Sequence, residues 1–115
     1  MTRYMPRHLV PSHVIVSAVR YGMGRKTYAD SDARDLIRVH WADMHEIDQQ
    51  VIREDIKAHL QLAKVFCRDD SHQNARHWRE QYGRWRYLLE HLDDKQMPAE
   101  PLSTPIYEEM TRDDI

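Results

Sequence analysis

Cysteine and glycine are scarce in this chain of 115 residues, which contains one cysteine and three glycines. A single cysteine, Cys67, excludes a disulfide within the chain and the zinc sites that need several thiolates. A lone thiol is also typical of a reducing compartment. Few glycines argue against a β-sandwich, which must reverse its chain at many turns. The shortage of glycine therefore favours an all-α protein.

Long apolar runs are also missing. The longest uncharged apolar stretch, residues 14–19, is far too short to cross a bilayer. Residues 1–11 lack the apolar core of a secretion signal and are interrupted by proline. We therefore expect a cytoplasmic protein with no membrane partner, and the length fits one small domain with one modest core.

Charge is distributed unevenly, although the net charge is only −2. Residues 1–28 carry five basic side chains and no acidic one, whereas residues 93–115 carry seven acidic and two basic side chains. Either end therefore offers a surface to a partner of opposite charge. The simpler alternative is that both ends are solvated.

Apolar periodicity predicts four helices, at about 12–22, 31–43, 46–67 and 71–92. The expected N-caps are small polar residues at the start of three of these helices: Ser12, Asp30 or Ser31, and Ser71. The first helix has an alternative, because the β-branched residues 14–16 are equally typical of a short strand. Gly22 and Gly24 are expected to end that helix, since glycine adopts the left-handed conformation of a helix C-terminus.

The last predicted helix carries an apolar heptad seam, formed by Ala75, Trp78, Tyr82, Trp85, Leu89 and Leu92. In so small a chain this seam favours core packing over an interface, and homodimerisation stays open. After Leu92 the composition becomes acidic and proline-containing, which predicts an extended and mobile tail with a short docked or helical piece at 105–112. The chain thus divides into a helical domain, 1–92, and an acidic tail, 93–115.

Metal binding and catalysis find little support in the residue spacing. Histidine occurs eight times, but the pairs His8–His13, His40–His45 and His72–His77 are five residues apart. On a helix that spacing turns two imidazoles about 140° apart, so they cannot share an ion. Cys67 has only Lys64 one turn away and no neighbouring base. We predict no metal site, no cofactor and no enzymatic activity.

Gly24 to Thr27 superficially resembles the end of a phosphate-binding loop. The lysine stands one position late, and a helix, instead of a strand, precedes the turn. These two departures argue against nucleotide binding.

The most conspicuous stretch of the chain is 20–28, which combines cationic and aromatic residues with two glycines and no acid. Its predicted binding residues are Arg20, Tyr21, Arg25, Lys26 and Tyr28, and a second basic group, Arg76 and Arg79, flanks Trp78. Such residues are typical of protein-binding hot spots. The alternative is a small nucleic-acid-binding or regulatory protein, since Arg3, Arg7 and the tyrosines also suit a nucleic acid. The pI of about 6.4 is low for that class.

Four segments resemble a group of small proteins encoded by bacteriophages and prophages. These segments are RYGMGRKTY at 20–28, HW at 40–41, IREDI at 52–56 and ARHW at 75–78. The resemblance covers roughly residues 13–85 and does not include the acidic tail. It implies a non-catalytic accessory protein that binds and inhibits a host protein in the bacterial cytoplasm. It further suggests a component of host defence, such as a CRISPR effector or a restriction enzyme, as the target.

Overall fold

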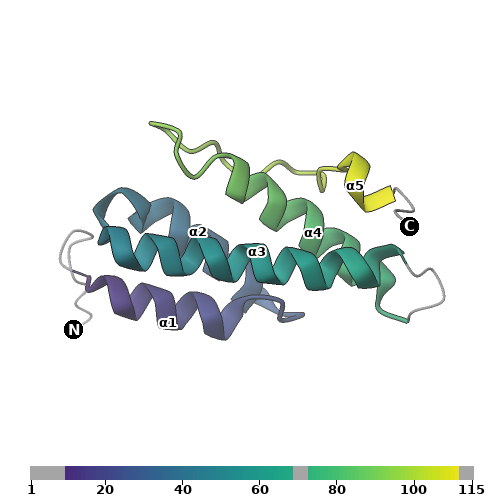
Figure 1. The fold of residues 1–115 in the computed structure, drawn as a ribbon, viewed down its shortest axis with the longest axis horizontal. Helices are drawn as coiled ribbons and strands as arrows, with labels where there is room; N and C mark the ends of the chain where they lie inside the picture. The colour runs from purple at the N-terminus through teal and green to yellow at the C-terminus, as the bar shows by residue number, and fades with distance from the viewer. Residues whose placement is uncertain (1–9, 69–72, 112–115) are drawn as a thin grey trace. The chain divides into compact units, whose positions relative to one another are not determined.

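The computed structural model describes residues 10–68 and 73–111 (Figure 1). Its elements are α1 (Ser12–Gly22), α2 (Tyr28–His40), the 3-10 helix η2 (Trp41–Asp43), α3 (Glu46–Arg68), α4 (Ala75–Glu90) and α5 (Glu108–Thr111). Within these described ranges there is no strand, and the predicted all-α class is confirmed. No helix in this part of the chain is both long and apolar enough to span a membrane.

Two predicted N-caps are wrong, whereas the predicted first helix, 12–22, matches α1. The second helix begins at Tyr28, where the Thr27 side chain accepts a hydrogen bond from the Ala29 backbone N–H at 3.2 Å. Ser12 lies inside α1, and its Oγ accepts a hydrogen bond from the backbone N–H of His45 at 2.8 Å. Thr27 therefore has the capping role predicted for Asp30 or Ser31, and Ser12 ties α1 to the start of α3.

The fourth helix is shorter than predicted. It runs over Ala75–Glu90, whereas residues 73–74 and 91–93 form turns. The predicted cap, Ser71, lies outside the described residues.

The chain forms two compact units, 1–55 and 56–115, with α3 contributing to both. The core of the first unit consists of Ile15, Val16, Val19, Ala33, Ile37, Trp41, Met44 and Ile52. The apolar periodicity of the sequence places Val14 and Ile47 on the buried faces of their helices, but both side chains are exposed. The inward-facing apolar residues of α1 are Ile15, Val16 and Val19, so Val16 is buried in place of Val14.

Gly22 allows α1 and α2 to approach closely. A Cβ atom at this position would lie 2.3 Å from the Ala29 carbonyl oxygen and 3.1 Å from Ala33 Cβ. Only a residue without a side chain fits such a contact. The predicted role of Gly22 as a helix stop is therefore incomplete, and Gly24, with φ of 84°, adopts the left-handed conformation.

The second unit packs α4 against the second half of α3. Its core consists of Ile56, Leu60, Ala63, Cys67, Ala75, Tyr82, Trp85, Leu88, Leu92 and Met110. Trp85 is completely buried, whereas Trp78 is half-buried, with its ring centroid 5.4 Å from that of Phe66. Most of the predicted heptad seam thus packs inside the unit, with Leu88 buried more fully than Leu89.

The residues after α4 run back beside that helix to α5 (Figure 1). A Cβ atom at Gly83 would lie 2.2 Å from the Pro105 carbonyl oxygen, so the C-terminal segment rests on the bare backbone of α4. Residues 97–107 form neither helix nor strand, with a bend at 102–103, and α5 lies within the range predicted for a docked helical piece. The expected mobility of the tail stays a prediction. The division into a domain at 1–92 and a tail at 93–115 stays a prediction.

Candidate protein-binding surface

The α1–α2 corner, residues 20–28, is held by a buried carboxylate. Asp30 accepts a hydrogen bond from the Gly24 backbone N–H at 2.7 Å and pairs with Arg34 one turn further along α2. Both of these charged side chains are buried. The Asp30 carboxylate therefore holds the backbone of the corner at Gly24, which has a positive φ.

Tyr21 and Arg25 associate on the outside of this corner. The Arg25 Nε donates a hydrogen bond to the Tyr21 carbonyl oxygen at 2.5 Å, and the guanidinium carbon lies 4.1 Å from the centre of the Tyr21 ring. This geometry is that of a cation–π contact. Tyr21 is nevertheless 65% exposed, so the stacked pair presents an ordered surface.

Tyr28 is the most exposed aromatic residue of the corner. It begins α2, and 88% of its surface is exposed. Lys26, between the two tyrosines, is also exposed. Four of the five residues predicted here are therefore exposed at one corner: Tyr21 at the end of α1, Arg25 and Lys26 on the connection, and Tyr28 at the start of α2.

Arg20 forms an ion pair with an acidic residue of the same unit. Its Nε lies 2.6 Å from Oδ2 of Asp55 on α3. This hydrogen bond, with the charge of Asp55, raises the pKa of the Arg20 guanidinium. Sequence reasoning missed Asp55, since the two residues are 35 positions apart and no local pattern joins them.

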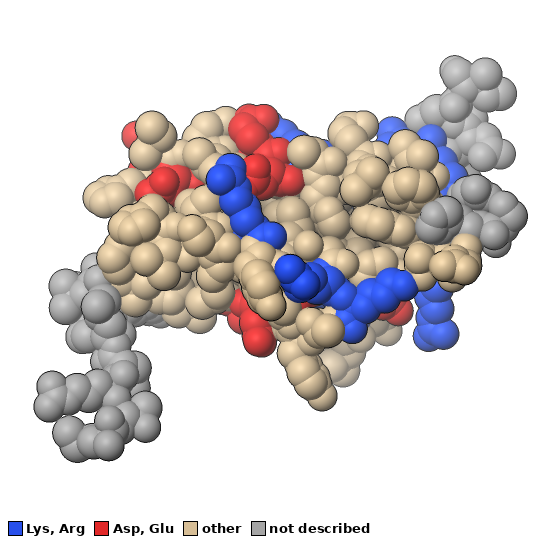
Figure 2. Space-filling model, turned by 90° about the horizontal axis from the view of Figure 1, so that it is seen from below, with Lys and Arg blue, Asp and Glu red and all other residues tan. Residues whose placement is uncertain are grey.

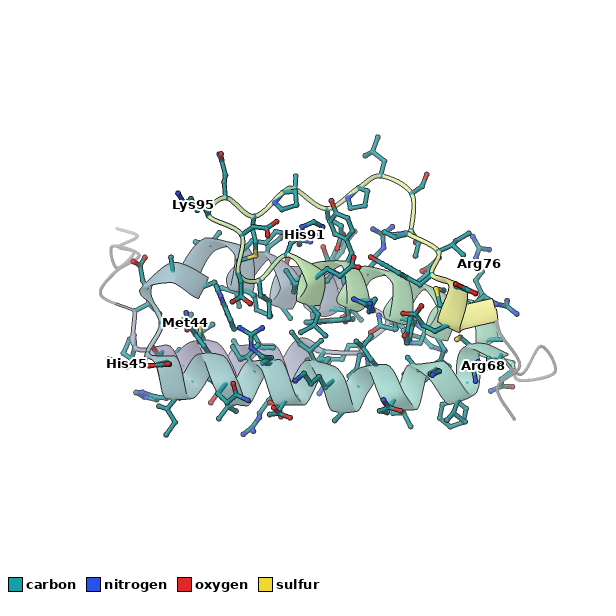
Figure 3. All side chains as sticks on the ribbon, turned by 45° about the horizontal axis from the view of Figure 1, so that its top comes forward. Met44, His45, Arg68, Arg76, His91 and Lys95 are labelled. Atoms are coloured by element: carbon teal, nitrogen blue, oxygen red, sulfur yellow. The ribbon has the colours of Figure 1, made fainter. Side chains whose placement is uncertain are left out.

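The second predicted group, Arg76 and Arg79, lies in the first turns of α4, in the second unit. Arg76 is 93% exposed, and its Nε is 3.8 Å from a carboxylate oxygen of Glu80 (Figure 3). Arg79 is exposed as well. Because the two groups belong to different units, each is a candidate surface by itself.

The basic residues do not stand apart from acidic ones. Figure 2 shows a face on which several Lys and Arg side chains have Asp and Glu side chains beside them. Arg3 and Arg7, which belong to the nucleic-acid alternative, lie outside the described residues. The described cations thus include pairs such as Arg20 with Asp55 and Arg76 with Glu80.

Two groups with catalytic potential, Cys67 and His59, are engaged in packing. Burial raises the pKa of the Cys67 thiol, and this effect exceeds the opposing influence of Arg68, Arg79 and Lys64. His59 Nε2 lies 2.7 Å from Oε1 of Gln81. The His59 ring also contacts the rings of Trp78 and Trp85. Among residues 10–68 and 73–111, no three His, Cys, Asp or Glu side chains converge to hold a metal ion.

A polar cluster around Glu109 was missed at the sequence level. Its carboxylate oxygen accepts hydrogen bonds from Tyr82 Oη and Arg86 Nε, both at 3.1 Å. Burial, and then this hydrogen bond, raises the pKa of Tyr82 to about 12. The available signal was Gly83, a glycine inside a strong helical pattern, which indicates a close backbone approach.

Comparison of the chain with protein-family models, with curated proteins and with solved structures finds no significant match in any of the three.

Proposed function

We propose that this protein is a non-catalytic accessory protein that binds and inhibits a host protein through the α1–α2 corner. The observation that carries the proposal is the exposure of Tyr21 and Tyr28, at 65% and 88%, on either side of a connection that Asp30 holds at Gly24. Tyrosine and arginine dominate interface hot spots. A preorganised corner also loses little conformational entropy when it binds.

The resemblance to phage-encoded proteins suggests what kind of protein the target is. A stoichiometric inhibitor needs an exposed, ordered surface and no catalytic group, which agrees with the exposed corner and the buried Cys67. We infer a host-defence component, of the CRISPR or restriction type, in the bacterial cytoplasm. Inhibition follows if the corner covers a surface that the target needs for its own substrate.

Capture from bacterial lysate tests this proposal. Wild type is compared with the double variant Tyr21→Ala/Tyr28→Ala and with the matched control Ile47→Ala, which removes an apolar side chain 76% exposed in the same unit. We expect the control to retain the captured partner. The double variant should lose affinity by about thirtyfold, which corresponds to about 2 kcal/mol. Equal capture by all three proteins would show that the corner is not part of the binding surface.

Inhibition needs its own measurement. The captured partner, once identified, is assayed with increasing amounts of wild type and of the double variant. Inhibition that saturates near one protein per target, and that the double variant fails to give, agrees with a stoichiometric inhibitor. Turnover of the target at far lower amounts would contradict the non-catalytic assignment.

The nucleic-acid alternative predicts a different dependence on salt. Binding through phosphate contacts weakens steeply as salt rises, because counterions are released. Mobility shifts with duplex DNA and with RNA at two ionic strengths therefore separate the alternatives. Micromolar binding with a steep salt dependence, lost in Arg25→Glu, would replace the protein-binding proposal by the nucleic-acid one.

A further inference from the structure

A groove of about 270 Å³ opens in the second unit between the beginning of α4 and the C-terminal segment. Its lining comes from two parts of the chain: Arg76, Arg79, Glu80, Thr104, Ile106 and Met110. Arg76 lies at the end of the unit where α5 is found (Figure 3). The groove is thus assembled by docking of the C-terminal segment onto α4.

The surface of the groove is mostly apolar, and its charged lining on α4 consists of two arginines and one glutamate. Met110 is buried, whereas 79% of the Ile106 surface is exposed to solvent. Arg76 projects from the α4 side, and its long contact with Glu80, at 3.8 Å, is of the weak exposed kind. A carboxylate from a ligand can therefore approach the Arg76 guanidinium while an apolar group covers Ile106.

The groove is also held open by contacts outside its lining. Arg68 Nη2 donates a hydrogen bond to the Glu109 carbonyl oxygen at 2.5 Å, and Tyr82 Oη donates one to the Glu109 carboxylate. Because Gly83 has no side chain, the backbone at Pro105 packs directly on α4. These contacts fix residues 104–110, so a ligand finds a preformed surface.

We propose that this groove binds a segment of a partner protein in which a large apolar side chain stands next to carboxylates. The apolar wall of Ile106 and Met110 accepts the side chain, and Arg76 and Arg79 complement the acidic neighbours. The volume suits one or two side chains, below the size of most small-molecule sites. An acidic, apolar peptide is thus the ligand class that matches both the shape and the charge.

This inference goes beyond the proposed function and is independent of it, since the α1–α2 corner belongs to the other unit. Each surface has its own variants. Loss of peptide binding in a groove variant that still captures the partner of the corner would separate the two sites.

Fluorescence anisotropy with the full chain tests the groove. The probe is a labelled peptide with leucine and phenylalanine at its centre and aspartates on both sides. Two further probes replace the aspartates by lysines, or the two apolar residues by serines. The protein variants are Ile106→Ser and Arg76→Glu. Leu102→Ser is the matched control, because Leu102 is fully exposed in the same segment and does not line the groove.

We expect saturable binding of the acidic, apolar peptide to wild type and to Leu102→Ser. Ile106→Ser and Arg76→Glu should each weaken it by about three- to tenfold, as expected for partly exposed contacts. No binding at about millimolar protein, or equal binding of the lysine probe, would overturn the proposal. Unchanged binding in both groove variants would do the same.

Gly83→Ala provides a second test that does not alter the lining. Its Cβ atom would displace the backbone at Pro105, so the groove should lose its second wall and the peptide should lose its affinity. Retained affinity in this variant, with residues 104–110 shown by hydrogen exchange to be undocked, would contradict a groove built by both parts.

Discussion

Gly22 and Gly83 serve the same purpose in two different settings. At each, a helix without a side chain receives a backbone carbonyl oxygen, from Ala29 and from Pro105. At Gly22 the approaching backbone belongs to α2, and the two helices form a corner with exposed tyrosines. At Gly83 it belongs to the C-terminal segment, and the result is a covered helix with a groove at its edge.

The comparison teaches that a close backbone contact has no fixed functional meaning. Its consequence depends on what the approaching segment carries. The α1–α2 corner brings Tyr21 and Tyr28 outward, whereas the C-terminal segment brings Met110 inward and leaves Ile106 at the rim. The same kind of contact therefore lies beside a protruding surface in one unit and beside a concave surface in the other.

The largest effect in this comparison is expected at Asp30, the anchor of the corner. Asp30→Ala leaves the buried Arg34 guanidinium without its carboxylate and removes the acceptor of the Gly24 N–H. We expect a loss of about 3 kcal/mol in the free energy of unfolding, measured by urea denaturation. The double variant Asp30→Leu/Arg34→Met should recover most of it, because it removes both charges together. A loss below about 1 kcal/mol in the single variant would contradict this role.

Alanine at each of the two glycines should distinguish the two contacts. Gly22→Ala forces α1 and α2 apart, and we expect it to lower the free energy of unfolding by about 1–3 kcal/mol. Gly83→Ala creates a similar clash but also improves helix propensity by about 1 kcal/mol, so its net effect on unfolding should be smaller. Hydrogen exchange should show faster exchange at 104–110 only in Gly83→Ala. Faster exchange throughout α4 would mean that the segment is needed to form the helix.

A smaller effect is expected from pH on the groove side. The pKa of Glu109 is lowered by a hydrogen bond with its own backbone and then by Arg86 and Tyr82. A lowered pKa in the folded state favours docking above the ordinary value of 4.5, and this contribution is lost as pH falls through the folded-state value. The NMR signal of the Met110 methyl group should therefore shift toward its solvent-exposed position on acidification.

Glu109→Gln is the control for this acid transition. It has no carboxylate to protonate, so the Met110 signal should change less between pH 5 and the acid limit. The same transition in wild type and in Glu109→Gln would show that another group controls docking.

The smallest effect is expected at the tip of the corner. Tyr28→Ala removes a ring that is mostly exposed, and it should change the free energy of unfolding by no more than about 0.5 kcal/mol. Thermal and urea unfolding measure this directly. A larger loss would indicate that Tyr28 packs in solution, and it would weaken the proposed binding role of the corner.

Periodicity was sufficient to predict the helices, because their buried faces repeat every three or four residues. The all-α class and the positions of α1, α3 and most of α4 follow from that pattern. The start of α2 was placed too late because two polar residues compete for the cap, and a sequence does not show that Thr27 binds the Ala29 N–H.

The candidate surfaces were only partly predictable. Tyr21, Arg25, Lys26 and Tyr28 are close in sequence, so their clustering could be seen in advance. The partner of Arg20 is 35 positions away, and the groove joins residues near 76–80 to residues near 104–110. Such distant pairs leave no local signature, and only the glycine at 83 hinted that another segment lies against α4.

The order of folding follows from the span of these contacts. The corner is closed by a hydrogen bond between residues six positions apart, whereas Cys67 Sγ meets the Met110 carbonyl oxygen across 43 positions. Closing a longer loop costs more entropy, and long-range contacts form more slowly. The corner can therefore take shape while α2 forms, whereas the groove exists only after the chain has returned to α4. Any partner of the groove consequently recognises a completed fold.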